Sequence, residues 1–204
     1  MKVIKQSWEY EEKPTKVLEK LEKVIRTCYR SEDKIDKGTA EKLVRRCIES
    51  KHESVLEFQH IAIRVTTSRA VLAEITRHRI GFSYAVESQR YVDNDNLKVI
   101  KPWWVDNVPW KDPRHQHWVH HMMASEKAYQ DLRFEGCSKQ EARGVLPNDT
   151  ATQMVICGNL RAWRHFFELR TAKGAYPQIR DLAKSILCSF NSDVPIVFED
   201  LVKE

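Results

Sequence analysis

Charged side chains interrupt this sequence so often that the longest stretch without Asp, Glu, Lys or Arg is eleven residues, found at 115–125 and again at 150–160. A helix that crosses a membrane needs about 20 consecutive apolar residues, so no membrane span is expected. The apolar residues must instead be buried on one face of amphipathic helices and strands. With 42% hydrophobic and 31% charged residues in a chain of 204, we expect one globular domain over residues 1–204.

The start of the chain and the cysteines bear on the compartment in which the protein works. The first sixteen residues, MKVIKQSWEYEEKPTK, carry charges of both signs and have no apolar central region, which is unlike a secretory signal. The five cysteines are odd in number and lie far apart, at positions 28, 47, 137, 157 and 188. This spacing indicates reduced thiols and no disulfide framework. We therefore expect a cytoplasmic protein.

Apolar residues at helical spacing alternate along the chain with two runs at the period-two spacing of strands. The predicted helices cover about residues 14–29, 39–50, 68–77, 112–134, 138–147, 159–170 and 177–190. The predicted strands cover about residues 58–66 and 150–157. Between residues 93 and 112, prolines, asparagines and three tryptophans predict an irregular segment that packs back on the body of the protein.

Chemistry-bearing side chains concentrate between Arg77 and Arg90, where three guanidiniums, an imidazole and two hydroxyls lie within fourteen residues. Close cations repel one another unless phosphates or carboxylates neutralise them, and an arginine can grip a phosphate with two parallel hydrogen bonds. One interpretation is a solvated surface turn with ion pairs to Glu74 and Glu87. The flanking residues are too apolar for an exposed basic loop, which favours cations that line a cleft.

A second cluster is the segment GNLRAWRHFFELRTAKGAYPQIRDLA at residues 158–183. If it begins as one helix, Trp163, Phe167 and Arg170 fall on the same face, so we expect Arg170 to be half-buried. A half-buried arginine needs a partner. An ion pair, for example with Glu168 of a neighbouring subunit or with Asp181, or a bound ligand would meet this need.

The opposite side of the same helix carries further charged residues. Arg161 and His165 are one turn apart and are expected to be available to a ligand. Arg164 and Glu168 are also one turn apart and are expected to form only an exposed ion pair.

Four segments of the chain resemble, in this order, the motifs of the flavin-dependent thymidylate synthase family: HESVLE at 52–57, RHRIGFSYAVESQRY at 77–91, EARGVLP at 141–147 and NLRAWRHFFELR at 159–170. The hallmark of that family is Arg-His-Arg, seven residues and then Ser, in a pattern that ends Ser-x-Arg-Tyr. Any one of these segments alone would be weak evidence. Together they cover about residues 50–190 and are specific.

The sequence departs from the family hallmark because eight residues, and not seven, separate Arg79 from Ser88. The position of a frequent acidic or amide ligand then falls on Val86 or on Glu87, and Glu87 is favoured because a valine has no acceptor atom. The extra residue is expected to be absorbed in a bulge or a wider turn at residues 81–82, since glycine adopts backbone angles that are closed to other residues.

The resemblance implies an α+β fold with a mainly antiparallel sheet flanked by helices, assembled as a homotetramer whose active sites combine residues of several subunits. It implies the reductive methylation of dUMP to dTMP, with 5,10-methylenetetrahydrofolate as carbon donor and NADPH as the reductant of bound FAD. Because the flavin carries the redox chemistry, no cysteine nucleophile is needed. No cysteine lies inside the four segments.

The resemblance also implies roles for individual residues. The residues that would bind FAD are Ser54, Glu57, Arg77, His78, Arg79, Glu87, Asn159, Arg161 and His165. The residues that would bind dUMP are Glu74, Arg77, Glu87, Ser88, Gln89, Arg90, Arg143 and Arg170. Ser88 and Arg170 would be catalytic, with Arg170 stabilising negative charge on the ionised pyrimidine ring in a pocket of low dielectric.

Two other classes of protein fit parts of the sequence. The net charge of +5, from 34 Lys and Arg against 29 Asp and Glu, and the six tryptophans suit a nucleic-acid-binding module. The tryptophans, however, cluster mainly in residues 103–118, away from the arginine-rich segments, so we expect no nucleic-acid partner. His117 and His121 are one helical turn apart and suggest zinc, but the glutamate of the H-E-x-x-H motif is missing and no metal is expected.

Overall fold

The computed structural model describes residues 1–202, and the chain divides into two compact units. The first unit holds residues 1–8, 65–77 and 85–154. The second unit holds residues 9–64, 78–84 and the residues from 155 onward. The expectation of a single domain over residues 1–204 stays a prediction.

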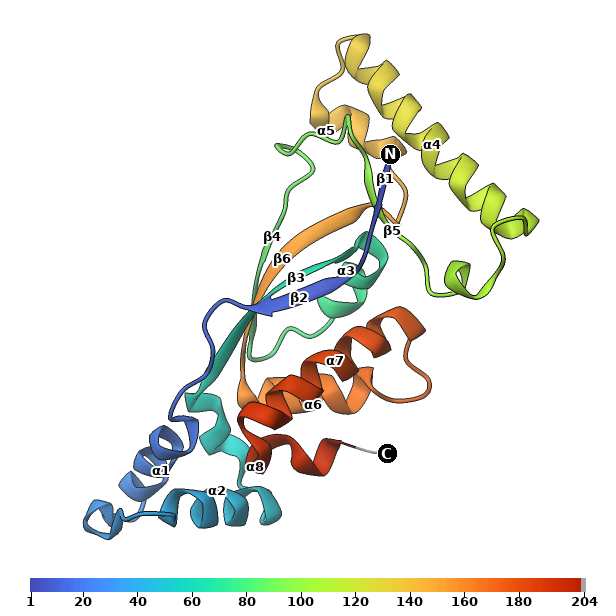
Figure 1. Ribbon diagram of the computed structural model, residues 1–204. Coiled ribbons are helices and arrows are strands. Elements are labelled where there is room, and N and C mark those ends of the chain that lie inside the picture. The colour runs from blue at the N-terminus through green and yellow to red at the C-terminus, as the bar shows by residue number, and fades with distance from the viewer. Residues whose placement is uncertain (203–204) are drawn as a thin grey trace. The chain divides into compact units, whose positions relative to one another are not determined.

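Helices and strands mix along the whole chain, as Figure 1 shows. The α-helices are α1 (Val17–Thr27), α2 (Thr39–Glu49), α3 (Arg69–Ile75), α4 (Pro113–Phe134), α5 (Lys139–Ala142), α6 (Leu160–Arg170), α7 (Pro177–Asp193) and α8 (Pro195–Phe198). The short 3₁₀ helices are η1 (Glu32–Lys34), η2 (Glu53–Phe58), η3 (Val105–Asn107), η4 (Arg143–Val145) and η5 (Glu199–Leu201). The strands are β1 (Lys2–Ile4), β2 (Ser7–Tyr10), β3 (His60–Ser68), β4 (Phe82–Val86), β5 (Lys98–Ile100) and β6 (Ala151–Asn159).

Four of the strands form a sheet in the order β2-β3-β6-β4. Backbone hydrogen bonds at both ends show that β3 and β6 run in opposite directions. Leu160 N, just after β6, donates to Gln59 O, just before β3, at 3.0 Å. Arg69 N, just after β3, donates to Thr150 O, just before β6, at 3.0 Å.

The β4 and β6 strands pair in the same antiparallel way. Asn159 N donates to Gly81 O at 3.0 Å, and Glu87 N donates to Gln153 O at 2.9 Å. The mainly antiparallel sheet of an α+β fold is therefore confirmed. A separate two-stranded sheet pairs β1 with β5 in parallel.

The first unit is built around α4. The α4 helix begins where it was predicted, because Asp112 accepts a hydrogen bond from Arg114 N at 2.9 Å and Pro113 occupies the first turn. A buried cluster joins the helix to the preceding segment through Leu97, Val99, Val105, Trp118 and Met122. The irregular segment 93–112 does pack back as expected, although it also contains β5 and η3, which the sequence did not predict.

The second unit is built around the apolar face of α6. Trp163 and Phe167 of this helix are fully buried and stack with ring centroids 5.7 Å apart. Phe190 of α7 and Phe198 of α8 complete the cluster, at 5.5 Å and 5.7 Å from the Phe167 ring. Trp163 Nε1 donates to Ile61 O at 3.0 Å, which ties α6 to β3. The predicted burial of the Trp163 and Phe167 face is thus confirmed.

Several predicted boundaries were wrong in detail. The helix expected to run from Ser68 into Arg77 ends at Ile75, and a turn follows. The helix expected at 138–147 divides into α5 and η4, although its capping box is present, with Ser138 and Glu141 bonded reciprocally. In the described part of the chain, no helix has the length and apolar character needed to cross a membrane.

Candidate functional site

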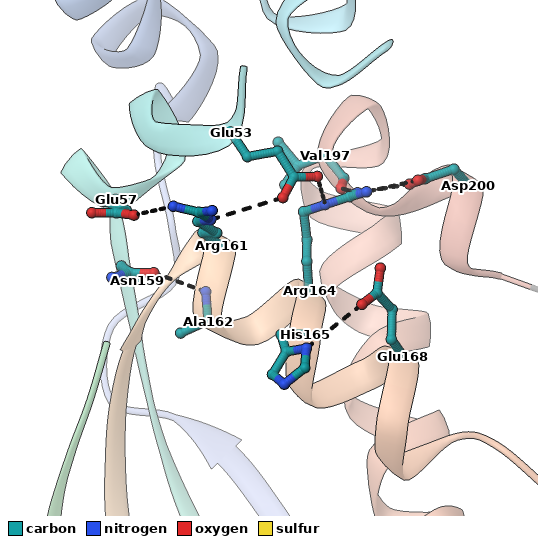
Figure 2. A network of polar contacts seen from close by, with 10 residues as sticks. All are labelled: Glu53, Glu57, Asn159, Arg161, Ala162, Arg164, His165, Glu168, Val197 and Asp200. Carbon is teal, nitrogen blue, oxygen red and sulfur yellow. Dashed lines mark hydrogen bonds and ion pairs between the residues drawn. The ribbon is translucent and has the colours of Figure 1, made fainter. Parts of the chain in front are cut away.

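The start of α6 carries the polar residues that the sequence assigned to a ligand, and Figure 2 shows them. Asn159 Oδ1 accepts a hydrogen bond from Ala162 N at 2.8 Å and so caps the helix. Arg161 Nη1 lies 2.7 Å from Glu57 Oε1, and the Arg161 side chain is 53% exposed. His165 is also exposed, with Nδ1 3.7 Å from Glu168 Oε2. Arg161 and His165 are therefore accessible as predicted, but Arg161 already has a carboxylate partner.

Arg164 corrects a prediction, because it does not form an exposed pair with Glu168. Its side chain is only 3% exposed, and its Nη1 and Nη2 each lie 2.7 Å from an oxygen of Asp200. Leu160 and Phe167, one turn before and after it on α6, are fully buried, so Arg164 points into the protein. It also donates to the carbonyl of Val197.

The charges around Arg164 favour its ionised form. Burial lowers the pKa of Arg164, but the hydrogen-bonded Asp200 and the nearby Glu53 more than compensate, so the pKa is raised. The same hydrogen bonds lower the pKa of Asp200. Glu53 Oε1 lies 3.5 Å from Arg164 Nε. Sequence reasoning missed both carboxylates as partners of Arg164, since nothing local indicates Asp200, which follows the last predicted helix.

His78 and Arg170, from different sequence motifs, come together in the second unit. Arg170 Nε donates to His78 Nε2 at 2.8 Å, which requires an Nε2 without a proton. The His78 ring is buried, and its centroid lies 5.0 Å from that of Phe166 and 6.1 Å from that of His165. Arg170 is half-buried as predicted, and the structure gives its Nε a partner within the same chain.

The turn before β4 fits closely against the start of α6. Gly81 has a φ of +76°, in the left-handed region. A Cβ at this position would lie 2.7 Å from Asn159 Nδ2 and 2.8 Å from Ala162 Cβ. The chain turns at residues 80–81, and Phe82 already belongs to β4; that the extra residue of this segment is absorbed here stays a prediction. Only glycine fits here, both for the backbone angle and for the space.

Three further residues lie near these groups in sequence. Ser54 and Arg79 are both exposed, Ser54 on η2 and Arg79 in the turn after His78. Tyr84 donates its hydroxyl hydrogen to the carbonyl of His78, and burial raises the pKa of Tyr84 to about 12. The Tyr84 hydroxyl therefore stays protonated and holds the His78 backbone at neutral pH.

The residues assigned to dUMP fall mainly in the first unit, where Ser88 to Arg90 form a turn. Ser88 Oγ accepts from Arg90 N at 3.3 Å. Arg90 Nε donates to Gln140 Oε1 at 2.6 Å, and its guanidinium lies 5.6 Å from the centre of the Tyr91 ring. The exposed Arg90 is thus pre-oriented by α5 and by its neighbour in sequence. Gln89 is half-buried in the same turn.

A second group of charges in the first unit includes Glu87 and Arg143. Burial and the charge of Arg143 lower the pKa of Arg69, while the charge of Glu87 raises it. The charges of Arg143 and Glu87 therefore both act on Arg69. The sequence analysis gave no role to Arg69, which is the first residue of α3.

The remaining site residues and the alternative metal site can be placed singly. Glu74 is half-buried on α3, and Arg77 is exposed in the turn after it. His117 and His121 are both exposed on α4. Over residues 1–202, no three His, Cys, Asp or Glu side chains are grouped so that they could hold a metal ion.

Comparisons with known proteins agree on one family. The family described as "thymidylate synthase complementing protein" matches residues 11–196. A flavin-dependent thymidylate synthase of Mycolicibacterium vanbaalenii is 36% identical over 193 residues, which cover 86% of this chain and 76% of that protein. A probable flavin-dependent thymidylate synthase of Mycobacterium phage L5 is 32% identical over 191 residues, which cover 86% of this chain and 77% of that protein.

A solved structure is similar in fold. The crystal structure of a UMP/dUMP methylase from Streptomyces cacaoi, bound with 5-Br dUMP, has a TM-score of 0.79 and covers 98% of this chain and 96% of its own. Its sequence identity is 23%, so this likeness concerns the fold alone.

Proposed function

Because this chain belongs to the flavin-dependent thymidylate synthase family, also described as thymidylate synthase complementing proteins, we propose that it methylates dUMP to dTMP with FAD as its flavin. The carbon comes from 5,10-methylenetetrahydrofolate and the reducing equivalents from NADPH. The assignment of this chain to the family rests on a match over residues 11–196 and on relatives that are 32–37% identical. The choice of FAD, the folate and NADPH rests on the resemblance of the four sequence segments.

The second unit offers groups that suit FAD. Arg161 and His165 are exposed at the start of α6, and Arg79 is exposed in the neighbouring turn. Guanidinium groups match the geometry of a diphosphate, and exposed rings can pack on a planar heterocycle. Ser54, Glu57, His78 and Asn159 of the same unit are also proposed to bind FAD, and the resemblance of the sequence segments adds Arg77 and Glu87, which belong to the first unit. When bound, FAD supplies the hydride-transfer chemistry that the protein side chains lack.

The residues proposed to bind dUMP lie in the first unit, and the resemblance of the sequence segments adds Arg170, which belongs to the second unit. Ser88, Gln89 and Arg90 bind the nucleotide, assisted by Glu74, Arg77, Glu87 and Arg143. The positive charge of Arg143, which lies close enough to Arg69 to lower the pKa of that guanidinium, suits the phosphate. Arg170 and Ser88 are the catalytic residues, and the guanidinium of Arg170 stabilises negative charge on the pyrimidine, which activates its C5 carbon.

The observation that carries this proposal is the contact between Arg170 and His78. It joins the hallmark Arg-His-Arg motif to the C-terminal arginine of the fourth segment across 92 residues of sequence. The proposed flavin residue and the proposed catalytic arginine therefore belong to one group of side chains. A chain that matched the motifs by coincidence would have no reason to bring these two residues together.

Uptake of FAD and reaction with NADPH test the proposal. Purified protein should show bound flavin absorbance or acquire it with added FAD, and it should oxidise NADPH at a rate that changes when dUMP is added. Protein that shows no bound flavin after incubation with excess FAD and removal of the unbound FAD would contradict the proposal. The homotetramer and the cytoplasmic location belong to the same proposal, and the molecular mass in solution measures the first directly.

A further inference from the structure

Arg164 is a buried arginine to which none of the sequence motifs gives a role, and it lies one turn from Arg161 on α6 (Figure 2). Asp200 accepts two hydrogen bonds of 2.7 Å from Nη1 and Nη2 on one edge of this guanidinium. The Nε edge faces Glu53 on η2. The guanidinium is therefore held between the C-terminal η5 and the segment that carries the proposed FAD residues.

Glu53 is a carboxylate that both arginines approach. Its Oε1 lies 3.5 Å from Arg164 Nε, and its Oε2 lies 4.0 Å from Arg161 Nε. Arg161 has a second carboxylate in Glu57, at 2.7 Å. If Glu53 turned fully toward Arg161, two carboxylates would occupy the guanidinium that is proposed to bind the FAD diphosphate.

The buried Nε of Arg164 favours the approach of Glu53. This Nε is buried, and within the described residues it has no hydrogen-bond acceptor of good geometry. A buried donor without an acceptor costs free energy, so approach of the nearest carboxylate is favourable. The nearest carboxylate on this edge is that of Glu53.

We propose that Arg164 is a positioning residue that draws Glu53 away from Arg161 and so keeps the Arg161 guanidinium available to the diphosphate of FAD. The inference rests on the proposed FAD site. Arg164 itself touches no cofactor in this account, because it is buried while Arg161 is exposed. Its positive charge and its Nε–H act through Glu53.

The test is the dissociation constant for FAD, measured from the change in flavin fluorescence, in three variants and one control. In Arg164→Met, Glu53 turns to Arg161, and the constant should rise roughly tenfold, within the coupling energies known for ion-pair networks. In Arg164→Met/Glu53→Gln the competing carboxylate is gone, and the constant should return to within about threefold of wild type. In Asp200→Asn, Arg164 holds Glu53 more firmly, so FAD binding should be unchanged or tighter.

Glu199→Gln is the matched control. Glu199 precedes Asp200 on η5 and pairs with the exposed Arg45, so this change loosens the same helix without touching Arg164. It should leave the FAD constant unchanged.

The opposite directions of the effects separate positioning from a merely structural role. If Arg164 only held the fold together, Asp200→Asn and Arg164→Met would both weaken FAD binding, and adding Glu53→Gln to Arg164→Met would weaken FAD binding further. Either result overturns the inference while wild type binds FAD. If Arg164→Met does not fold, weaker FAD binding in Asp200→Asn alone overturns it and unchanged or tighter binding supports it. Wild-type protein that takes up no FAD overturns the proposed function and this inference together.

Discussion

Replacing Gly81 by alanine should destabilise the second unit by two separable effects. The φ of +76° places a Cβ in a strained backbone conformation, which costs roughly 1–2 kcal/mol. The new Cβ would also lie 2.7 Å from Asn159 Nδ2 and 2.8 Å from Ala162 Cβ, closer than real Cβ contacts. Relieving such an overlap costs about 1–3 kcal/mol. The free energy of unfolding should therefore fall by roughly 2–5 kcal/mol.

Gly38→Ala is the matched control because Gly38 has almost the same φ, +78°, and a Cβ there would meet nothing within 4 Å. Backbone strain and the loss of unfolded-chain entropy then cancel between the two variants. Denaturant unfolding of both should show Gly81→Ala to be less stable than Gly38→Ala by about 1–3 kcal/mol, the contribution of the overlap alone. Equal losses in the two variants would refute this reasoning.

The same substitution should weaken FAD binding more than dUMP binding. The atoms that the new Cβ meets belong to Asn159, a proposed FAD residue, and to Ala162, whose N–H Asn159 caps. The dissociation constant for FAD should therefore rise in Gly81→Ala and not in Gly38→Ala. A loss confined to dUMP binding would show that the turn at Gly81 acts on Ser88 instead.

Three further predictions follow from single contacts. Arg170→Lys keeps the charge but loses the planar fork, so FAD should stay bound while dTMP formation falls roughly 10²–10³-fold; near-normal turnover would contradict this. Hydrogen bonds from Arg114 lower the pKa of Asp112 from its usual value of 3.8 to about 2. The ionised carboxylate therefore stabilises the fold fully above pH 3.8, and this stabilisation is lost as the pH falls through about 2. An NMR titration of Asp112 should show a midpoint at about pH 2, and Arg114→Ala should raise that midpoint. Burial raises the pKa of Asp149, whose carboxylate accepts a hydrogen bond from Trp118 Nε1 at 2.7 Å. In denaturant unfolding at pH 7, Asp149→Asn should therefore be as stable as wild type or more stable, whereas Asp149→Ala should lose about 1–3 kcal/mol because Trp118 Nε1 loses its acceptor. An Asp149→Asn variant less stable than wild type would contradict this.

The fold was predictable from the sequence where an element carries its own start and stop signals. The α4 helix has Asp112 and Pro113 at its start and Gly136, with a φ of +91°, after its end, and its predicted bounds are correct. The β4 strand lies inside the arginine-rich segment, where charged and turn residues outweigh a five-residue run. Such short strands take their stability from their neighbours in the sheet and have no local pattern that identifies them.

The site was predictable to the extent that helical spacing fixes it. Spacing placed Arg161 and His165 on an exposed side of α6, and the structure agrees. It failed for Arg164, because a spacing shows which residues share a face and not which carboxylate lies opposite. The carboxylate that keeps Arg164 buried is Asp200, 36 residues away in an element with no sequence signal.

Conversion of dUMP is the measurement that tests the central claim most directly. Purified protein loaded with FAD, given dUMP, 5,10-methylenetetrahydrofolate and NADPH, should form dTMP, detected by its mass. Omitting any one of these reactants should abolish the product, and so should Arg170→Ala, which should still bind FAD. Protein that binds FAD and oxidises NADPH yet forms no dTMP from dUMP would contradict the account.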